Sequence, residues 1–360
     1  MKKLRLSRAA AAAFVLLALF AAACVQNPQQ TQRAGGGAGQ SGPVRIGLSM
    51  DTLKEERWQR DRDLFVARAK ELGAEVSVLS ANGDDRVQMQ QAESLLTQGV
   101  NVLVVIPHNG EVAATIVQSA KARGVPVVSY DRLIRSSEPA LYVSFDNEKV
   151  GEMQARYLLE RAPKGNYVLI GGAPTDNNAL LFRKGQMNVI GPARERGDIQ
   201  VVSDQWAKDW LASEALRITE DALTKSGNQV AAVVASNDAT AGGAVSALEV
   251  QRLAGKVLVS GQDADLAALQ RIVAGTQAMT VYKPVHLLAR RAAEAAVALA
   301  RGEKVETRAA VNNGSVDVPS ILLEPVVVDR NNIMETVVKD GYQKPEAIYE
   351  NVPPEQRPKP

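Results

Sequence analysis

The sequence predicts an α/β fold made of two lobes, each containing a doubly wound parallel β-sheet that helices cover on both faces. Apolar runs rich in β-branched residues alternate with amphipathic helical patterns from residue 44 onward. The alternation restarts near residue 167, without a segment of linker composition between the two series. Strands that are apolar on both faces are typical of parallel sheets buried between helices. The roughly 318 residues that follow residue 42 are enough for two domains of ordinary size.

The two series define where a binding site is expected. The first has predicted strands at 44–50, 76–79, 102–106 and 125–130, and helices at 55–72, 85–98 and 110–123. The second has strands at 167–170, 199–202, 230–235, 257–260 and 278–282, and helices at 179–196, 213–225, 240–253 and 285–301. In such sheets ligands bind beyond the carboxyl ends of the strands, so the residues that follow each strand are the candidates.

The first 23 residues have the pattern of a secretory signal peptide. Four basic residues precede an apolar run at 9–23, whose 15 residues are fewer than the ~20 that a membrane-spanning helix needs. The run ends at Cys24, the only cysteine, which excludes an internal disulfide. The segment Ala21 to Cys24 resembles a bacterial lipobox, although Ala21 stands where leucine is usual. We therefore expect an exported protein, in the periplasm or on the outer face of the cell membrane, with a lipid anchor at Cys24 as its only membrane attachment.

Residues 24–42 are rich in Gln, Gly and Pro, which predicts a flexible tether. Its glycines satisfy the GxGxxG pattern, but they precede the first strand, whereas a dinucleotide site needs this pattern between a strand and a helix. Without residues 1–23 the chain keeps 38 of its 42 Lys and Arg against 40 Asp and Glu, a formal net charge of −2. This charge is close to zero, and the sequence contains no basic stripe, so it gives no indication of a nucleic-acid partner.

Polar and aromatic side chains gather after the predicted strands. They are suited to a sugar, because hydroxyls accept and donate charge-assisted hydrogen bonds and the C–H faces of a sugar ring lie against aromatic rings. The residues are Asp51, Arg57, Trp58, Asp131, Arg132, Trp206, Trp210, Asn237, Asp238, Gln262, Asp263 and Lys283.

Each of these residues also has a purely structural interpretation. Asp131 and Asn237 could cap the helices that follow them, and Trp58 could belong to the core, since it lies seven residues before Phe65. Arg132, Lys283 and the further basic residue Arg183 could be surface charges, as most such residues are. The set is therefore stronger evidence than any member.

Catalytic and cofactor chemistry finds little support in the sequence. The two histidines, His108 and His286, have no metal-ligand spacing, and the phosphate-loop and GxSxG patterns are absent. Asp131 and Asp263 could form a glycosidase carboxylate pair, but nearby basic residues would hold both charged. We therefore expect no catalytic residue, no metal and no cofactor.

Motifs at these strand ends closely resemble those of the bacterial D-xylose-binding proteins, the periplasmic components of ABC xylose transporters. The similarity extends from about residue 44 to about residue 340. It is carried by EERWQRDRDLF (55–65), SANGDD (80–85), VIPHNG (105–110), SYDRLI (129–134), SFDNEKVGEMQA (144–155), GGAPTDNNALLFRKGQM (171–187), DQWAKDW (204–210), ASNDATAGGA (235–244), SGQDADLA (260–267) and GTQAMTVYKP (275–284).

The resemblance implies a type I periplasmic-binding-protein fold, with two lobes joined by three crossovers. It implies a first lobe of 43–146 and 284–317, a second lobe of 147–283 and 318–345, and a loose tail at 346–360. The ligand contacts that it implies are Arg57, Trp58, Asp131, Arg132, Asn178, Arg183, Trp210, Asn237, Asp263 and Lys283.

The function that the resemblance implies is that of a monomeric receptor that closes on D-xylose and hands it to an ABC permease. A receptor for arabinose, glucose or galactose is the alternative within the same class. A sugar-responsive transcription regulator would need a helix-turn-helix segment ahead of residue 44, where the signal pattern stands.

Overall fold

The computed structural model describes residues 42–358. The predicted signal peptide, Cys24 and all of the predicted tether except residue 42 lie outside the described residues. None of the helices within 42–358 is both long and apolar enough to cross a membrane.

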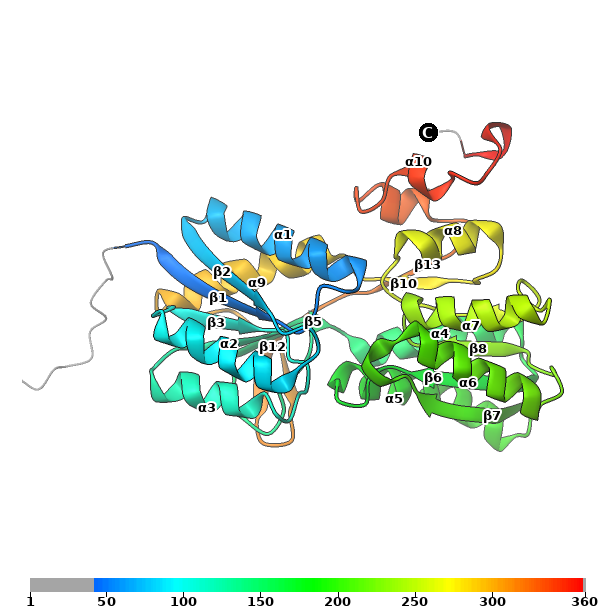
Figure 1. Cartoon of the computed structure of the whole chain (residues 1–360), viewed down its shortest axis with the longest axis horizontal. Coiled ribbons are helices and arrows are strands. Elements are labelled where there is room, and N and C mark those ends of the chain that lie inside the picture. The colour runs from blue at the N-terminus through cyan, green and yellow to red at the C-terminus, as the bar shows by residue number, and fades with distance from the viewer. Residues whose placement is uncertain (1–41, 359–360) are drawn as a thin grey trace, which may run out of the picture. The chain divides into compact units, whose positions relative to one another are not determined.

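A seven-stranded sheet forms the first lobe, with the strand order β11-β12-β5-β4-β3-β1-β2. All neighbouring strands are parallel except β11 and β12. The strands are β1 (Val44–Met50), β2 (Ala74–Ser80), β3 (Val102–Val105), β4 (Val127–Tyr130), β5 (Leu141–Phe145), β11 (Ala309–Asn312) and β12 (Asp317–Leu323). Helices α1 (Glu56–Glu71) and α9 (Val285–Ala300) cover one face, and α2 (Asp85–Thr97) and α3 (Ala114–Ala122) cover the other (Figure 1).

The central strand β3 shows why this sheet needs helices on both faces. Its sequence VLVV is fully buried, and successive side chains point to opposite faces of a strand. Val102 and Val104 pack against α1 and α9, whereas Leu103 and Val105 pack against α2 and α3. An uninterrupted apolar run is therefore stable only in the middle of a three-layer arrangement.

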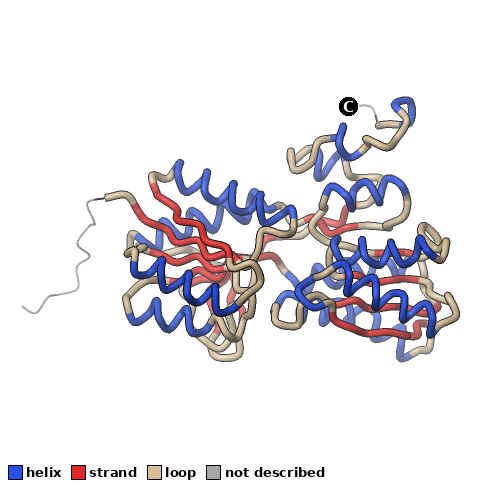
Figure 2. Tube along the Cα trace, in the orientation of Figure 1, coloured by secondary structure: helices blue, strands red, loops and turns tan. Residues whose placement is uncertain are grey.

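The second lobe contains a four-stranded parallel sheet with the order β7-β6-β8-β9. Its strands are β6 (Gly165–Gly171), β7 (Ile199–Trp206), β8 (Ala232–Ala235) and β9 (Leu258–Val259). Helices α4 (Asn147–Arg161) and α5 (Asn177–Glu195) cover one face, and α6 (Ala212–Lys225) and α7 (Asp238–Val250) cover the other (Figure 2). Helix α8 (Leu266–Ala274) and the antiparallel pair β10 (Thr280–Tyr282) and β13 (Val326–Val328) extend this lobe.

The chain passes between the lobes three times, as predicted. The crossings are β5 to α4, β10 to α9 and β12 to β13. The predicted α/β class with parallel sheets is confirmed, together with most predicted elements. Strand β5, helices α4 and α8 and the last three strands were not predicted.

The structure corrects two predicted bounds. The return segment of the first lobe does not end at residue 317, because β12 continues to Leu323 and its last four residues, from Ser320, pair with β5. The predicted loose tail does not begin at 346, because α10 (Pro345–Ile348) packs on α8. Ile348 and Tyr349 are buried there in one apolar cluster with Tyr342.

Helices α6 and α7 approach closely at Gly243. A Cβ atom at this position would lie 2.0 Å from the backbone oxygen of Ala212 on α6. The neighbouring Gly242 lies in the same helix, and a Cβ there would meet only the flexible guanidinium of Arg271, at 3.3 Å. Helix packing therefore requires a glycine at Gly243 but not at Gly242.

We predict that Gly243→Ala lowers the free energy of unfolding by about 1–3 kcal/mol or more, because two backbones must separate. Gly242→Ala is the matched control and should leave stability unchanged or raise it by up to about 1 kcal/mol through helix propensity. Urea unfolding followed by circular dichroism measures both. Equal stability of the two variants would contradict the close approach.

Candidate functional site

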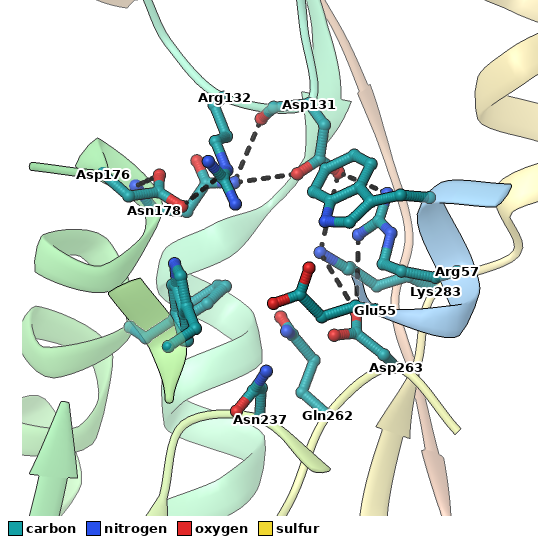
Figure 3. A pocket seen from close by; sticks show the side chains of 13 residues that line it. Glu55, Arg57, Asp131, Arg132, Asp176, Asn178, Asn237, Gln262, Asp263 and Lys283 are labelled. Atoms are coloured by element: carbon teal, nitrogen blue, oxygen red, sulfur yellow. Dashed lines mark hydrogen bonds and ion pairs between the residues drawn. The ribbon is translucent and has the colours of Figure 1, made fainter. Parts of the chain in front are cut away.

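A cavity with a total empty volume of about 320 Å³ lies where the carboxyl ends of both sheets meet the crossovers. Side chains from both lobes point into it (Figure 3). They are Glu55, Arg57, Trp58, Asp131 and Arg132 from the first lobe, Asp176, Asn178, Phe182, Trp210, Asn237, Gln262 and Asp263 from the second, and Lys283 from a crossover.

The structure brings nine of the ten predicted site residues to this cavity and leaves out Arg183. The guanidinium of Arg183 pairs instead with Asp204, and its Nε donates to Gln186 Oε1 at 3.0 Å. Four lining residues are not among these ten: Glu55, Asp176, Phe182 and Gln262, of which Gln262 was one of the strand-end candidates.

Arg57, at the start of α1, is buried among three carboxylates. Its guanidinium nitrogens lie 3.2 Å from Asp61 Oδ2, 3.0 Å from Asp131 Oδ2 and 3.4 Å from Asp263 Oδ1. Asp61 and Asp131 belong to the first lobe, whereas Asp263 follows β9 of the second. The one cation therefore links the two lobes beneath the cavity.

Lys283, just after β10, reinforces this cluster. Its Nζ lies 3.6 Å from both Asp131 Oδ2 and Asp263 Oδ1. Burial alone would raise the pKa of Asp131, but Arg57, Lys283 and Arg132 outweigh burial and hold the pKa below its usual value. Asp131 is therefore ionised at neutral pH and presents a charged acceptor.

Arg132 joins the lobes on another side of the cavity. Its NH1 donates to Asp51 Oδ2 at 2.6 Å, and its Nε lies 2.8 Å from Asp176 Oδ2 of the second lobe. Asp176 also caps α5, since its Oδ1 accepts from the Asn178 backbone N–H at 2.9 Å. Both oxygens of Asp176 are thus occupied by the protein.

Behind Arg132, His108 extends the chain of charges. Its Nδ1 lies 2.9 Å from Asp51 Oδ1. Burial opposes ionisation of Asp51, but Arg132 and His108 lower its pKa to about 2. The hydrogen bond to Asp51 raises the pKa of His108 above its usual value, against a smaller effect of burial. Asp51 therefore fixes Arg132 from outside the cavity.

The side-chain amides of Asn178 and Asn237 make hydrogen bonds within the protein, and both residues also line the cavity. Asn178 Nδ2 donates to the backbone oxygen and to Oδ1 of Asp131, both at 3.1 Å, and so crosses between the lobes. Asn237 caps α7 in a capping box, where its Oδ1 accepts from the Thr240 backbone N–H at 2.9 Å. Figure 3 shows its amide nitrogen turned toward the cavity. The capping and binding interpretations of Asn237 are therefore compatible.

Two tryptophans line the cavity from opposite lobes. Trp58 also packs in the core against Phe65, and the Arg132 guanidinium lies 5.2 Å from its ring centroid. Trp210 makes an edge-on contact with Phe182, with the ring centroids 6.3 Å apart. A Cβ on Gly172 would lie 2.0 Å from the Trp210 ring, so this glycine is needed for the position of the indole.

Strained backbone accompanies the cavity residues. Asp131, Trp210 and Asp263 have φ values of 58°, 59° and 101°, in the region that side chains other than glycine rarely adopt. Such strain persists where the surrounding structure imposes it, most often at ligand sites. It turns these three side chains toward the cavity.

Several polar atoms of the lining are buried without a hydrogen-bond partner among residues 42–358. They are both carboxylate oxygens of Glu55, the indole nitrogen of Trp210 and Oε1 of Gln262. Buried polar groups are nearly always hydrogen-bonded, so these atoms are where a ligand with several donors and acceptors would bind. Within the described part of the chain, no group of three or more His, Cys, Asp or Glu is placed to hold a metal ion.

Sequence signals existed for some of the missed residues. Asp176 stands three residues before the predicted helix at 179–196, in TDNN, which is an N-cap signal, and Gln262, already a strand-end candidate, follows the predicted strand at 257–260. Phe182 has the spacing of a core residue in α5, and Glu55 precedes α1 among other charges. Neither pattern distinguishes a cavity residue from an ordinary helix residue.

Comparison with known proteins places this fold and site in context. Residues 46–304 match the family described as periplasmic binding protein domain. The D-xylose-binding periplasmic protein of Haemophilus influenzae is 57% identical over 85% of this chain and 92% of its own length. That of Escherichia coli is 56% identical over 84% and 91%.

Solved structures agree with this family. A carbohydrate transporter solute binding protein from Chloroflexus aurantiacus, in complex with D-glucose, has a TM-score of 0.80 at 32% identity and covers 84% of this chain and 97% of its own. An ABC transporter solute binding protein from Clostridium phytofermentans with bound β-D-glucose has a TM-score of 0.79 at 30% identity, with coverages of 84% and 99%.

The Asp51–His108 pair predicts a pH dependence of stability. Because the pKa of His108 is raised in the folded state, its contribution is complete below about pH 6.5 and is lost as the pH rises through the raised value. In the His108→Gln variant, the free energy of unfolding should no longer fall over this pH range. Urea unfolding from about pH 6 to about pH 9 compares the two proteins. Parallel pH profiles of the two would rule out a stabilising charged pair.

Proposed function

Because this chain belongs to the periplasmic binding protein family, we propose that it binds D-xylose in the cavity and delivers the sugar to an ABC import permease. The observation that carries this proposal is a single cavity lined from both lobes by charged acceptors, amides and two tryptophans. Identities of 56–57% to proteins named for D-xylose binding support this choice of sugar.

The charges of the cavity favour a neutral ligand with many hydroxyls. Arg57 is paired with three carboxylates, and Arg132 and Lys283 are each paired with two carboxylates. No cation of the lining is therefore left over for an anionic ligand. The outer lone pairs of these carboxylates and the amide nitrogens match sugar hydroxyls, and Trp58 and Trp210 supply apolar surfaces for the ring.

Closure of the lobes is the proposed response to the sugar. Arg57 to Asp263, Arg132 to Asp176 and Asn178 to Asp131 all connect the lobes around the cavity. A ligand that contacts both lobes binds the closed form better than the open one, so it shifts the population toward closure. The permease would recognise the closed, loaded form.

The arrangement supports a receptor rather than a glycosidase. A glycosidase needs one carboxylic acid that reaches the ligand and carries a proton. The lowered pKa of Asp131 keeps it ionised. Burial raises the pKa of Asp176, but Arg132 and the α5 N-terminus occupy its two oxygens.

In the cell, we place the protein in the periplasm or on the outer face of the membrane, as a monomer. The names of the relatives, which call them periplasmic, support export. The sequence pattern that ends at Cys24 supports a lipid anchor at this residue as the only membrane attachment.

D-Glucose is the second candidate ligand, because two structural neighbours were solved with it. It differs from xylose by a hydroxymethyl group on the ring. The aromatic and basic side chains of the lining would have to leave room for this extra group. The identities of 56–57% to proteins named for D-xylose binding favour the pentose.

A panel of sugars tests the ligand. At about one hundred times its dissociation constant, a ligand stabilises the folded protein by about 2.7 kcal/mol, which raises the melting temperature. D-Xylose should give the largest rise at equal concentration, ahead of arabinose, ribose, galactose and glucose. If glucose raises the melting temperature more than xylose does, glucose is the ligand. If no monosaccharide raises the melting temperature, the receptor function is contradicted.

Asn237→Ser separates capping from binding. Serine caps helices about as well as asparagine, so the melting temperature should change little. The loss of the amide donor leaves a sugar hydroxyl unpaired, and affinity measured by calorimetry should fall at least about tenfold. Asn237→Ala should lose stability as well. Unchanged xylose affinity in the serine variant would show that Asn237 only caps α7.

A further inference from the structure

Glu55 is a cavity residue whose carboxylate makes no hydrogen bond within the described part of the chain. It stands at the N-cap position of α1 but makes no side-chain cap hydrogen bond. Its side chain is only 8% exposed, and neither carboxylate oxygen has a hydrogen-bond partner among the described residues. Figure 3 shows the carboxylate extended into the cavity, facing the space between the second-lobe side chains.

The nearest cation does not satisfy this carboxylate. Lys54 Nζ lies 3.2 Å from Glu55 Oε1 but makes no hydrogen bond to it, and it donates instead to the backbone oxygen of Asp209 at 2.8 Å. The basic residues of the lining are held by other carboxylates: Arg57 by Asp61, Asp131 and Asp263, Arg132 by Asp51 and Asp176, and Lys283 by Asp131 and Asp263.

This arrangement has an energetic consequence. A buried polar group without a hydrogen bond loses its hydration and gains nothing in return, and the loss is larger for a charged group. The ion pair with Lys54 therefore compensates only part of the hydration that the Glu55 carboxylate loses when the lobes close. Hydroxyl groups that donate to its oxygens would remove the penalty, whereas a ligand with a carboxylate would increase it.

We propose that Glu55 is a ligand-binding residue, whose carboxylate accepts hydrogen bonds from sugar hydroxyls and so selects neutral sugars over sugar acids. This inference rests on the proposed function, since it assigns a further contact within the same cavity. Glu55 also opposes closure without a ligand, because only a bound donor satisfies both of its oxygens.

The test combines two variants with changes in the sugar. Glu55→Leu removes both acceptors and leaves a somewhat shorter apolar side chain, and Glu55→Gln keeps an acceptor but removes the charge. Calorimetry with D-xylose should show at least about a tenfold loss of affinity for Glu55→Leu and a smaller loss for Glu55→Gln. Glu75→Gln, an exposed carboxylate on β2, is the matched control and should bind as the wild type does.

Xylose lacking single hydroxyls distinguishes a direct contact from an indirect effect. Wild-type protein should bind one of the 2-, 3- or 4-deoxy sugars at least about tenfold more weakly than xylose, and Glu55→Leu should not discriminate against that same sugar. Equal xylose affinity in wild type and Glu55→Leu, tighter binding by the variant, or unchanged discrimination among the deoxy sugars would each overturn the inference. Failure of the wild type to bind xylose would instead overturn the proposed function.

Discussion

The buried guanidinium of Arg57 is the interaction on which the arrangement of the cavity depends. It lies within 3.4 Å of carboxylates from both lobes, with Asp131 on one side and Asp263 on the other. A buried charge is stable only when it is paired and hydrogen-bonded. The lobes must therefore approach each other for Asp263 to contribute, and the charged acceptors are then fixed around the ligand.

Other features of the site follow from this pairing of charges. Because carboxylates already neutralise Arg57, Arg132 and Lys283, the cavity presents acceptors held at fixed positions rather than free cations. The backbone at Asp131 and Asp263 adopts strained conformations that keep these acceptors directed inward. The same arrangement leaves both carboxylate oxygens of Glu55 without a hydrogen bond among the described residues, although Oε1 lies 3.2 Å from Lys54 Nζ, so a sugar can supply the missing donors.

Much of this site could be predicted because parallel strands place their carboxyl ends together. Asp131, Asn237 and Asp263 were found from their positions after strands, and the cavity contains all three. Arg183 could not be placed in the same way, because it lies in the middle of α5 and its direction depends on the partner Asp204. Glu55 was missed because nothing in the local sequence distinguishes a buried carboxylate at the start of a helix from an exposed one.

The fold shows the same limit. Long apolar strands such as β3 are evident from sequence alone, since both of their faces are buried. Strand β12 has a half-polar sequence, and only its pairing with β5 assigns it to the first lobe. The segment around Tyr349 looks loose in sequence, because its apolar residues are few and their partners lie in α8, about eighty residues earlier in the chain.

The central claim is that the sugar brings the two lobes together, and a distance measurement tests it most directly. Arg86 and Ser213 are exposed residues beside a groove that both lobes line, so cysteines at these positions can carry spin labels once Cys24 is replaced by serine. Saturating D-xylose should convert a broad distance distribution into one narrow, shorter distance. A distribution that saturating xylose leaves unchanged would contradict closure on the ligand.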